Sequence, residues 1–365
     1  MSLVIGLMSG TSLDGIDAVL VDFSQHPHHP PVTVASFCLP YSDRIRQQAL
    51  QLQSARHDEI HTAALLANEL ARCYADAAGE VLTKAGVDTT QVAAIGCHGQ
   101  TIRHQPAAGY SVQLNNPALL AELSGIAVVA DFRSRDIAAG GQGAPLVPAF
   151  HAGVFGDPAR HRIILNIGGI ANLTDLHPGK PVRGFDCGPG NLLMDAWIDR
   201  HHGERYDNAG AWAAQGRVLP ELLQSLLRDS FFAASPPKSC GRDEFNMAWL
   251  ETRLAGSEQP EDVQATLLEL TAATATQAIR RWCGNPVELF ACGGGAHNQV
   301  LMTRLQQLVP DCRVAATDVL GQPADWVEAV AFAWLAWRTL NDEPGNLPEV
   351  TGARGQRILG AIYPR

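Results

Sequence analysis

Three short turns in this sequence combine glycine with small polar residues, and each follows a stretch that reads as a β-strand. They lie at residues 10–12, 168–169 and 293–295, the last of them just before Asn298. Glycine lets backbone N–H groups approach phosphate oxygens closely, and the hydroxyl groups beside the first turn add donors. Two such hairpins facing each other could clamp a triphosphate. For each turn taken alone, the alternative is a glycine needed only for the backbone angles of the turn.

The common nucleotide-binding motifs are absent from the sequence. No segment matches G-x-x-x-x-G-K-[ST], and no strand is followed by G-x-G-x-x-G. The first motif builds a phosphate-binding loop and the second a dinucleotide site. If this protein binds a nucleotide, other turns must hold it.

The elements that would position these turns follow from the hydrophobic pattern. Residues 4–23 read as strand, turn and strand, and residues 32–41 continue as a third strand, which predicts a β-meander. Apolar residues recur at helical spacing from 58 to 84, and Gly86 ends that run as a C′ glycine does. Short buried strands with polar or glycine-rich ends follow between residues 92 and 133. Such strand ends are where α/β sheets bind ligands.

The second half of the chain repeats the pattern of the first. After a Gly/Pro-rich stretch at 138–151, the segments 162–176 and 182–191 again read as strand, glycine turn and strand. Helical segments come next, followed by a strand at 288–295 and a strongly apolar helix at 327–340. We therefore expect two related α/β halves, although two hairpins make this a coarse repeat.

A segment rich in proline and histidine, residues 24–31, lies between the second and third strands. Its side chains include three potential metal ligands within four positions, His26, His28 and His29. Prolines interrupt the segment and no carboxylate is near, which favours an exposed hairpin loop over a metal site.

Composition excludes several classes of protein. With 365 residues, 46% of them hydrophobic and 18% charged, the chain can form two domains with sizeable cores. A net charge of −10 without a cluster of Lys or Arg argues against a nucleic-acid or anionic-membrane partner. The N-terminus lacks the basic start of a signal peptide, and no apolar run approaches the roughly 20 residues that span a bilayer. We therefore expect a cytoplasmic protein.

The eight cysteines are spread singly along the chain. No Cys-x-x-Cys pair indicates a zinc or redox site, so small buried thiols are expected in a reducing compartment. Four cysteines fall inside the glycine-rich motifs and would be neighbours of a functional site: Cys97, Cys187, Cys240 and Cys292.

Eight segments, in chain order, resemble the anhydro-N-acetylmuramic acid kinase family. They are GLMSGTSLDGID (6–17), GCHGQTIRH (96–104), ADFRSRDIAAGGQGAPLVP (130–148), LNIGGIANLT (165–174), FDCGPGNLLMD (185–195), PPKSCGRDEFN (236–246), CGGGAHN (292–298) and EAVAFAWLA (328–336). The resemblance implies an α/β protein with two similar actin/hexokinase-like (ribonuclease H-like) domains and a cleft between them for ATP and sugar. The domains would span residues 1–145 and 146–365, with the last segment returning to the first domain.

The same resemblance implies a reaction. Water opens the 1,6-anhydro bridge of the sugar while the γ-phosphoryl group of ATP moves onto O6, giving N-acetylmuramic acid 6-phosphate for the recycling of bacterial cell-wall amino sugars. Asp186, in FDCGPGN, matches the family's catalytic base and would deprotonate the water that attacks C1. One carboxylate is enough because phosphorus captures the leaving oxygen. The alternative for Asp186 is a residue that caps the start of the following helix.

The resemblance also assigns a site for ATP with Mg²⁺. The N-terminal phosphate loop would consist of Gly10, Thr11, Ser12, Leu13, Asp14, Gly15, Ile16 and Asp17. The second half would contribute Gly168, Gly169, Gly293, Gly294, Gly295 and Asn298, with the triple-glycine turn facing the adenosine. Met8 stands where the wider superfamily has an aspartate that serves the metal. The magnesium ligands therefore stay unassigned, with Asp14 and Asp186 as candidates.

Two charged residues are candidates for orienting the sugar and its lactyl carboxylate. Arg133 suits a carboxylate through bidentate donation, unless it forms a salt bridge with Asp131 or Asp136. Glu328 lies on an otherwise apolar helix, where it needs a partner unless it serves only as a residue near the positive end of the helix.

His98 and Gln100, in CHGQT, would line the same cleft, although a histidine at a strand end is as often structural. The implied partners are a small-molecule sugar and, as a family expectation, a second copy of the chain. Two other functions stay open: a kinase for another sugar on the same fold, and a non-enzymatic nucleotide switch of the actin or Hsp70 kind. The switch predicts an exposed apolar docking surface or an appended binding domain, and neither is evident in the sequence.

Overall fold

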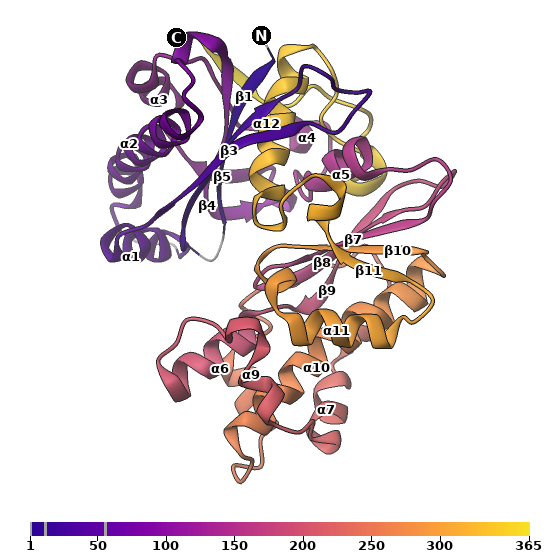
Figure 1. Ribbon diagram of the computed structural model, residues 1–365. Coiled ribbons are helices and arrows are strands. Elements are labelled where there is room, and N and C mark those ends of the chain that lie inside the picture. Colours follow the sequence, from indigo (N-terminus) through magenta and orange to yellow (C-terminus); the bar gives the residue numbers. More distant parts are fainter. Residues whose placement is uncertain (1, 11–12, 55–56) are drawn as a thin grey trace. The chain divides into compact units, whose positions relative to one another are not determined.

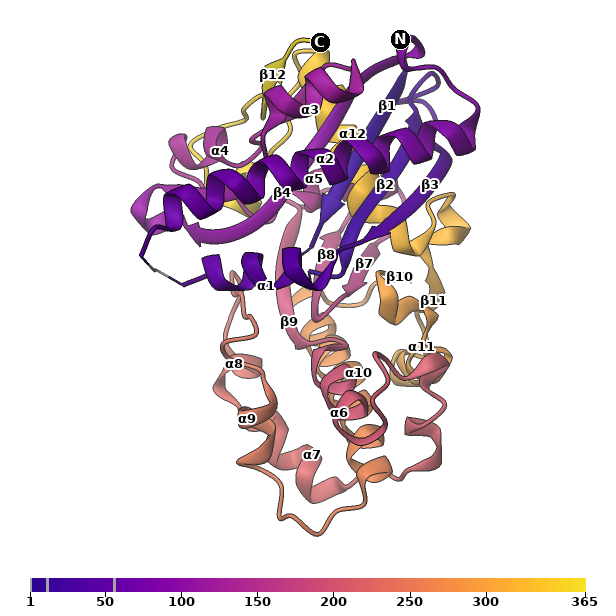
Figure 2. The same cartoon turned by 90° about the vertical axis from the view of Figure 1, so that its left-hand side faces the viewer.

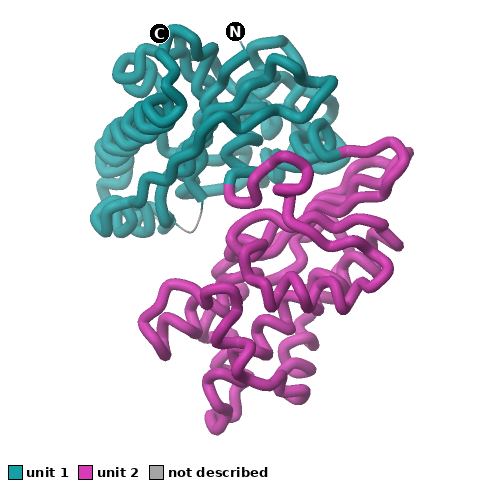
Figure 3. Tube along the Cα trace, viewed as in Figure 1, with its two compact units in different colours: residues 1–155, 326–365 teal, residues 156–325 magenta. Residues whose placement is uncertain are grey.

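The structure, a computed structural model, describes residues 2–10, 13–54 and 57–365. The chain divides into two compact units, which are residues 1–155 with 326–365 (unit 1) and residues 156–325 (unit 2) (Figure 3). Each unit holds one mixed β-sheet covered by helices (Figure 1), which confirms the α/β class. The predicted division into domains at residue 145 stays a prediction.

Within the described residues, unit 1 is built on a seven-stranded sheet in the order β12-β6-β4-β1-β2-β3, with β5 paired to β4. Its strands are β1 (Leu3–Ser9), β2 (Gly15–Asp22), β3 (Val32–Pro40), β4 (Val92–Gln105), β5 (Tyr110–Leu114), β6 (Val128–Ala130) and β12 (Ala361–Tyr363). Its helices are α1 (Asp43–Leu52), α2 (Glu59–Ala85), α3 (Pro117–Ser124), α4 (Ser134–Ala138), α5 (Val147–Phe155), α12 (Val327–Leu340) and α13 (Pro348–Thr351). The first three strands form the expected antiparallel meander.

Unit 2 holds a five-stranded sheet in the order β11-β10-β7-β8-β9. Its strands are β7 (Arg162–Ile167), β8 (Ile170–Leu176), β9 (Arg183–Pro189), β10 (Glu288–Cys292) and β11 (Arg313–Ala316). Its helices are α6 (Leu192–His202), α7 (Pro220–Leu227), α8 (Ser230–Ala233), α9 (Met247–Glu251), α10 (Pro260–Ala278) and α11 (Gln299–Leu308).

The two sheets share one strand order. In each sheet an antiparallel meander comes first, and two later strands then add in parallel beside the first one, giving β3-β2-β1-β4-β6 and β9-β8-β7-β10-β11. The expectation of two similar halves is confirmed. The turns after β1 and β7 therefore occupy equivalent positions, at the carboxyl ends of strands where α/β sheets bind ligands.

Helix α2 covers one face of the unit 1 sheet (Figure 2). It matches the predicted helical run, and Gly86 follows it in the left-handed conformation at φ 64°. Its apolar stripe packs against β-strand residues: Leu70 and Tyr74 share one buried cluster with Ile5 and Leu7. Burial of this stripe explains why the helical period was readable in the sequence.

Helix α12 packs on the opposite face of the sheet. Side chains alternate between the two faces along β1, so Gly6 faces α12 while Ile5 and Leu7 face α2. Gly6 and Gly96 are paired across β1 and β4. A Cβ atom on Gly6 would lie 2.0 Å from the carbonyl oxygen of Ala329, and one on Gly96 would lie 2.2 Å from that of Phe332. The two glycines therefore let the helix backbone lie directly on the sheet, which fixes the start of α12 over β1.

Helix α10 is the central helix of unit 2. Fifteen of its 19 residues are buried, and Thr271 Oγ1 donates to the carbonyl of Gly190 over 2.9 Å, which anchors the chain just after β9. The predicted helix continues beyond α10 as a π-helical turn at Ile279–Cys283. Neither α10 nor any other helix in the described part of the chain is long and apolar enough to cross a membrane.

The Pro/His segment between β2 and β3 differs in part from the expected exposed loop. His28 and His29 are exposed, whereas His26 is half-buried. Trp334 Nε1 donates to His26 Nε2 over 3.3 Å, and the Trp337 ring lies 4.9 Å from the imidazole. Aromatic residues of α12 therefore hold this histidine, a contact across some 300 residues that no local pattern reveals.

Candidate functional site

The turn between β1 and β2 is held by side chains of β4 and α2. Gln100 is fully buried, and its Nε2 donates to the carbonyl of Gly10 over 3.1 Å. Ser9 Oγ and Tyr74 Oη lie 2.8 Å apart in a hydrogen bond. Leu13 ends the turn with a positive φ of 60° and a buried side chain. Gln100 therefore supports the predicted phosphate loop, whereas its contact with a sugar stays a prediction.

The rest of the predicted phosphate loop is only partly turn. Thr11 and Ser12 lie outside the described residues, and Asp14 is exposed. The residues that already belong to β2 are Gly15, Ile16 and Asp17. A Cβ atom on Gly15 would lie 2.4 Å from the backbone of β3, so strand packing explains that glycine. Ile16 is fully buried, which leaves only its backbone to face a ligand.

Arg133, His98 and Glu328 come together at one end of the unit 1 sheet. Arg133 follows β6, His98 lies on β4, and Glu328 lies in the first turn of α12. Arg133 Nη2 donates to His98 Nε2 over 2.8 Å, and Nη1 donates to the carbonyl of Gly143 over 2.7 Å. Because arginine can only donate, the imidazole accepts at Nε2 and carries its proton on Nδ1.

Burial and mutual charge set the protonation of this cluster. Burial, helped by the charge of Arg133, holds the pKa of His98 far below its ordinary value. Burial lowers the pKa of Arg133 to about 10, and Glu328 opposes that shift. Burial raises the pKa of Glu328, the charge of Asp17 on β2 raises it further, and Arg133 lowers it. At neutral pH the arginine is therefore a partly buried cation beside a neutral imidazole.

The aspartates near Arg133 in sequence have other partners. Asp131 accepts from Ser134, and Asp136 accepts from the backbone N–H of Gly143. Within the described residues, no ion pair joins Arg133 to either aspartate, so the salt-bridge alternative is not what the structure has. Nε of Arg133 also has no hydrogen-bond partner among those residues. The guanidinium retains donors that can bind an anion.

Asp186 lies on β9, opposite Asn172 of β8. Its backbone N–H donates to the carbonyl of Lys238 over 3.1 Å, and its Oδ2 accepts from the backbone N–H of Cys240 over 2.9 Å. The segment 238–240 therefore orients the carboxylate from outside the sheet. The helix-cap alternative does not hold, because α6 begins six residues later at Leu192.

The environment of Asp186 makes it a weaker acid than an exposed aspartate. Burial raises its pKa to about 6, against the Cys240 hydrogen bond, which lowers it. The charge of Glu244 raises the pKa further, and that of Lys238 lowers it. A carboxylate with this pKa is mostly ionised at neutral pH, yet it is basic enough to accept a proton from water during a reaction.

The glycines after β7 are not required by the packing of the protein. The turn is bound to the start of α6, because Gly190 N–H donates to Gly169 O and Asn191 N–H to Gly168 O, over 2.9 and 2.8 Å. The nearest atom to a Cβ on Gly168 would be 3.7 Å away, and on Gly169 it would be 3.9 Å away. Side chains would fit there, so the open space is available to a ligand that needs bare backbone.

The triple-glycine turn after β10 contains two glycines that the fold requires and one that it does not. Gly293 has a φ of 76°, and a Cβ on Gly295 would lie 2.3 Å from Ile167, so the fold itself requires these two. Gly294 has open space, with its nearest neighbour 3.8 Å away. Asn298 caps α11 by accepting from the backbone N–H of Leu301 over 3.0 Å. The turn is thus rigid, with one exposed glycine.

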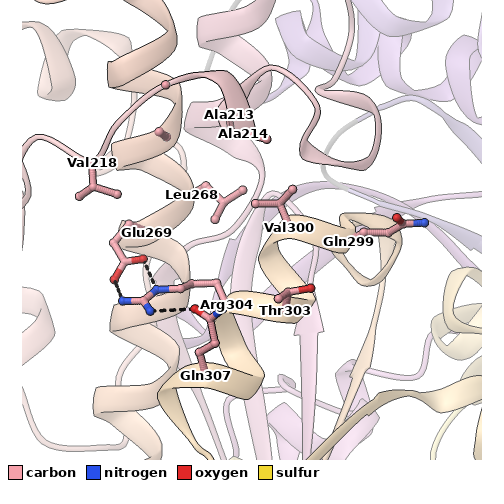
Figure 4. Close-up of a pocket in the computed structure, with 12 residues that line it drawn as sticks. Ala213, Ala214, Val218, Leu268, Glu269, Gln299, Val300, Thr303, Arg304 and Gln307 are labelled. Carbon is pink, nitrogen blue, oxygen red and sulfur yellow. Dashed lines mark hydrogen bonds and ion pairs between the residues drawn. The ribbon is translucent and has the colours of Figure 1, made fainter.

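A cavity of about 610 Å³ lies beside the first turns of α11 (Figure 4). Its lining comes from α10, α11 and the segment before α7: Ala213, Ala214, Gly216, Val218, Ala265, Leu268, Glu269, Gln299, Val300, Thr303, Arg304 and Gln307. Leu268 and Val300 face it from two helices, and Arg304 forms a two-point hydrogen bond with Glu269 at its border (2.6 and 2.8 Å). Because α11 directly follows the triple-glycine turn, this cavity adjoins a predicted nucleotide-binding element.

The magnesium ligands stay unassigned. In the described part of the chain, no group of three or more His, Cys, Asp or Glu side chains could hold a metal ion. Magnesium commonly needs only one or two protein carboxylates when nucleotide phosphates and water complete its shell. The residues present are compatible with that minimal arrangement, since Asp14 is exposed and Asp186 is ionised at neutral pH.

Sequence reasoning missed the residues that support these sites. The backbone of Lys238 and Cys240 and the carbonyl of Gly143 act through main-chain groups, which carry no side-chain signal. Leu268 and Val300 of the cavity occupy helical positions that are typical of core residues. Only the tertiary structure distinguishes these roles.

Comparison with known proteins places the whole chain in one group. The sequence profile described as "Anhydro-N-acetylmuramic acid kinase" matches residues 2–365. The chain is 58% identical to the anhydro-N-acetylmuramic acid kinase of Nitrosospira multiformis, covering 99% of this chain and 98% of that protein. It is 57% identical to that of Thiobacillus denitrificans (99% and 96% covered) and 54% identical to that of Pseudomonas paraeruginosa (99% and 98% covered). These matches run the full length of the sequence, so the chain belongs to the anhydro-N-acetylmuramic acid kinase family.

Proposed function

We propose that this protein is an ATP-dependent kinase that opens 1,6-anhydro-N-acetylmuramic acid with water and phosphorylates O6. The products are N-acetylmuramic acid 6-phosphate and ADP, and the reaction serves the recycling of peptidoglycan amino sugars in the cytoplasm. Membership of the family over the whole chain supports the reaction class. The observation that carries the proposal is Asp186, a partly buried carboxylate fixed by a backbone amide, with a pKa of about 6.

Asp186 acts as the general base. It accepts the proton of the water that attacks C1, and the hydrogen bond from Cys240 N–H keeps one carboxylate oxygen oriented while the other accepts that proton. As C1–O6 breaks, O6 takes the γ-phosphoryl group, so no acid is needed to protonate the leaving oxygen. ATP supplies the phosphoryl group, and bound Mg²⁺ neutralises part of its charge.

Arg133 and Glu328 bind the sugar. The remaining donors of Arg133 suit the lactyl carboxylate, because the guanidinium fork matches a carboxylate in a bidentate pair. His98 holds the fork in place by accepting at Nε2, and its neutrality avoids repulsion with the arginine. Glu328 then accepts from sugar hydroxyl or amide groups near the same cation.

The nucleotide binds to the glycine turns and the neighbouring cavity. Gly168, Gly169 and Gly294 have open space above their backbones, as a phosphate cradle requires. The cavity of about 610 Å³ beside α11 has apolar walls that include Leu268 and Val300 and suits a purine base.

The reaction can be tested directly. The protein is incubated with ATP, Mg²⁺ and 1,6-anhydro-N-acetylmuramic acid, and both ADP and the sugar product are measured, beside Asp186→Asn and the surface control Asp311→Asn. The proposal expects a phosphorylated open-ring sugar from wild type and control, and a loss of at least about 10³-fold in Asp186→Asn. Release of ADP with another sugar alone would favour a different sugar kinase. Nucleotide binding without sugar-dependent turnover would favour the nucleotide switch.

A further inference from the structure

The C-terminal segment of unit 1 closes over the loop that fixes Arg133. This loop, residues 139–143, follows α4. Gln142 N–H donates to the carbonyl of Thr351 over 2.8 Å, and Arg354 N–H donates to the carbonyl of Ala139 over 2.9 Å. More than 200 residues of sequence separate the two partners in each pair. The loop conformation therefore depends on a distant part of the chain.

Asp136 is the centre of this contact. It is fully buried, and its Oδ1 accepts from Asn346 Nδ2 over 2.7 Å and from Thr351 Oγ1 over 2.8 Å. Its Oδ2 accepts from the backbone N–H of Gly143 over 2.8 Å. We call Asp136, Asn346 and Thr351 the clasp. All three side chains are at most 3% exposed, so each lost hydrogen bond would leave a buried polar group without its partner.

The clasp leads to Arg133 through one residue. Asp136 fixes the nitrogen of Gly143, and the carbonyl of Gly143 accepts from Arg133 Nη1 over 2.7 Å. Gly143 has a φ of 66°, a left-handed conformation that its short loop must maintain. The other anchor of the guanidinium is His98 Nε2 at 2.8 Å. With both anchors in place, the guanidinium cannot turn freely, so the directions of its remaining N–H groups are set.

We propose that the clasp is a positioning device that holds Arg133 in the orientation needed to bind the carboxylate of the sugar. The inference rests on the proposed function of Arg133 and goes beyond it, because it assigns a role in selecting anionic substrates to residues that do not touch the substrate. A small rotation of the Gly143 carbonyl would turn the guanidinium fork, and bidentate pairing tolerates little rotation.

Thr351→Val tests the clasp with little change of shape, because it removes one donor to Asp136 and keeps the branched side chain. The substrates are 1,6-anhydro-N-acetylmuramic acid and the same sugar with its lactyl carboxylate converted to an amide. We expect KM for the acid to rise about 10-fold with kcat within about 2-fold, and the preference for acid over amide to fall by a similar factor. Thr351→Ser restores the hydroxyl and should restore both values.

Thr339→Val is the matched control. Thr339 is buried in the same unit and donates to the carbonyl of Leu359, so it also anchors the C-terminal segment, but away from Asp136. It should leave the preference for acid over amide unchanged, at whatever cost in Tm. Should Thr351→Val fail to fold, Asn346→Ala removes the other donor to the same oxygen and is measured in the same way.

Three results would contradict the proposed role of the clasp. They are an unchanged preference in folded Thr351→Val, an equal loss of turnover for both sugars, and the same loss of preference in the Thr339→Val control. These differ from failure of the proposed function, in which wild-type protein turns over neither sugar. If the wild-type protein turned over both sugars equally well, Arg133 would not recognise the lactyl carboxylate, and the proposed role of the clasp would fail with it.

Discussion

The carboxylate of Asp186 and the backbone N–H of Cys240 form a hydrogen bond of 2.9 Å that joins two segments 54 residues apart. The donor belongs to the main chain, so the thiol of Cys240 is not part of it. The base is therefore oriented by the path of the 238–240 segment, and the identity of residue 240 matters only where it changes that path.

Replacement of Cys240 tests this reading. Cys240→Ser keeps the amide donor and should retain kcat/KM within about 3-fold, whereas Cys240→Pro removes it and should lower kcat/KM by about 10²-fold or more. Steady-state kinetics with circular dichroism of both variants provides the measurement. A serine variant as inactive as the proline variant would mean that the thiol itself takes part.

The pH dependence of the reaction should report Asp186. A base must be deprotonated to act, and its pKa of about 6 places the acidic limb of the kcat/KM profile near pH 6, where an exposed aspartate would give a limb near 4. Glu244→Gln removes a charge that raises this pKa, so the midpoint should move to lower pH. A profile that is flat from pH 5 to 8 would contradict the assignment.

The raised pKa also predicts an effect on stability. The folded protein binds the Asp186 proton more tightly than the unfolded chain, so the stability of the wild type falls as pH rises from about 4 to about 6 and stays lower above that range. Asp186→Asn has no such loss. It should be more stable than wild type by about 1–2 kcal/mol at pH 8, with little difference below pH 4. Urea unfolding at both pH values checks this, and an equal change at both would refute it.

The glycines of the nucleotide turns should separate into two classes. Gly168→Ala has room for its methyl group, so Tm should change by less than about 2 °C while KM for ATP rises about 10-fold. Gly293→Ala must place a side chain at a φ of 76° and 2.5 Å from Asn166 Oδ1, so it should lower Tm strongly. Thermal unfolding and ATP kinetics of the pair provide the test. An unaltered KM in Gly168→Ala would exclude close approach of a phosphate at this turn.

The cavity beside α11 should be filled by a bulky side chain at position 300. Val300→Trp is expected to raise KM for ATP by about 10-fold or more and to leave KM for the sugar within about 2-fold, because only the purine would be displaced. Val319→Trp, at an exposed valine of the same unit, is the control. Equal KM values for ATP in both variants would place the base elsewhere.

Much of the fold was predictable because local patterns and burial agree. The helix at 58–84 was read from its apolar period and its C′ glycine, and α2 occupies 59–85. The meander at the N-terminus and the repeated hairpin of the second half follow from alternating strands around glycine turns. The π-helical end of α10 was not predictable, since IRRWC continues an acceptable helical pattern.

The candidate site was predictable only where side chains carry the signal. Arg133 and His98 were expected near one ligand, and the structure joins them by a hydrogen bond. Gln100 was expected to line the sugar cleft; that contact stays a prediction, and the structure adds a hydrogen bond from its amide to the carbonyl of Gly10. No sequence pattern reveals either hydrogen bond, because each depends on which acceptor the fold brings beside the side chain: the His98 imidazole at 2.8 Å from Arg133 and the Gly10 carbonyl at 3.1 Å from Gln100.

Gly6 and Gly96 lie directly against the backbone of α12, so the position of Glu328 depends on two residues outside the candidate site. Even one methyl group at position 6 would overlap the carbonyl of Ala329, the residue next to Glu328. A side chain at either glycine would have to push the start of α12 away from the sheet, which would displace Glu328 and weaken the packing of unit 1 at the same time. Substitutions at Gly6 or Gly96 should therefore change sugar affinity and thermal stability together, although neither residue belongs to the candidate site.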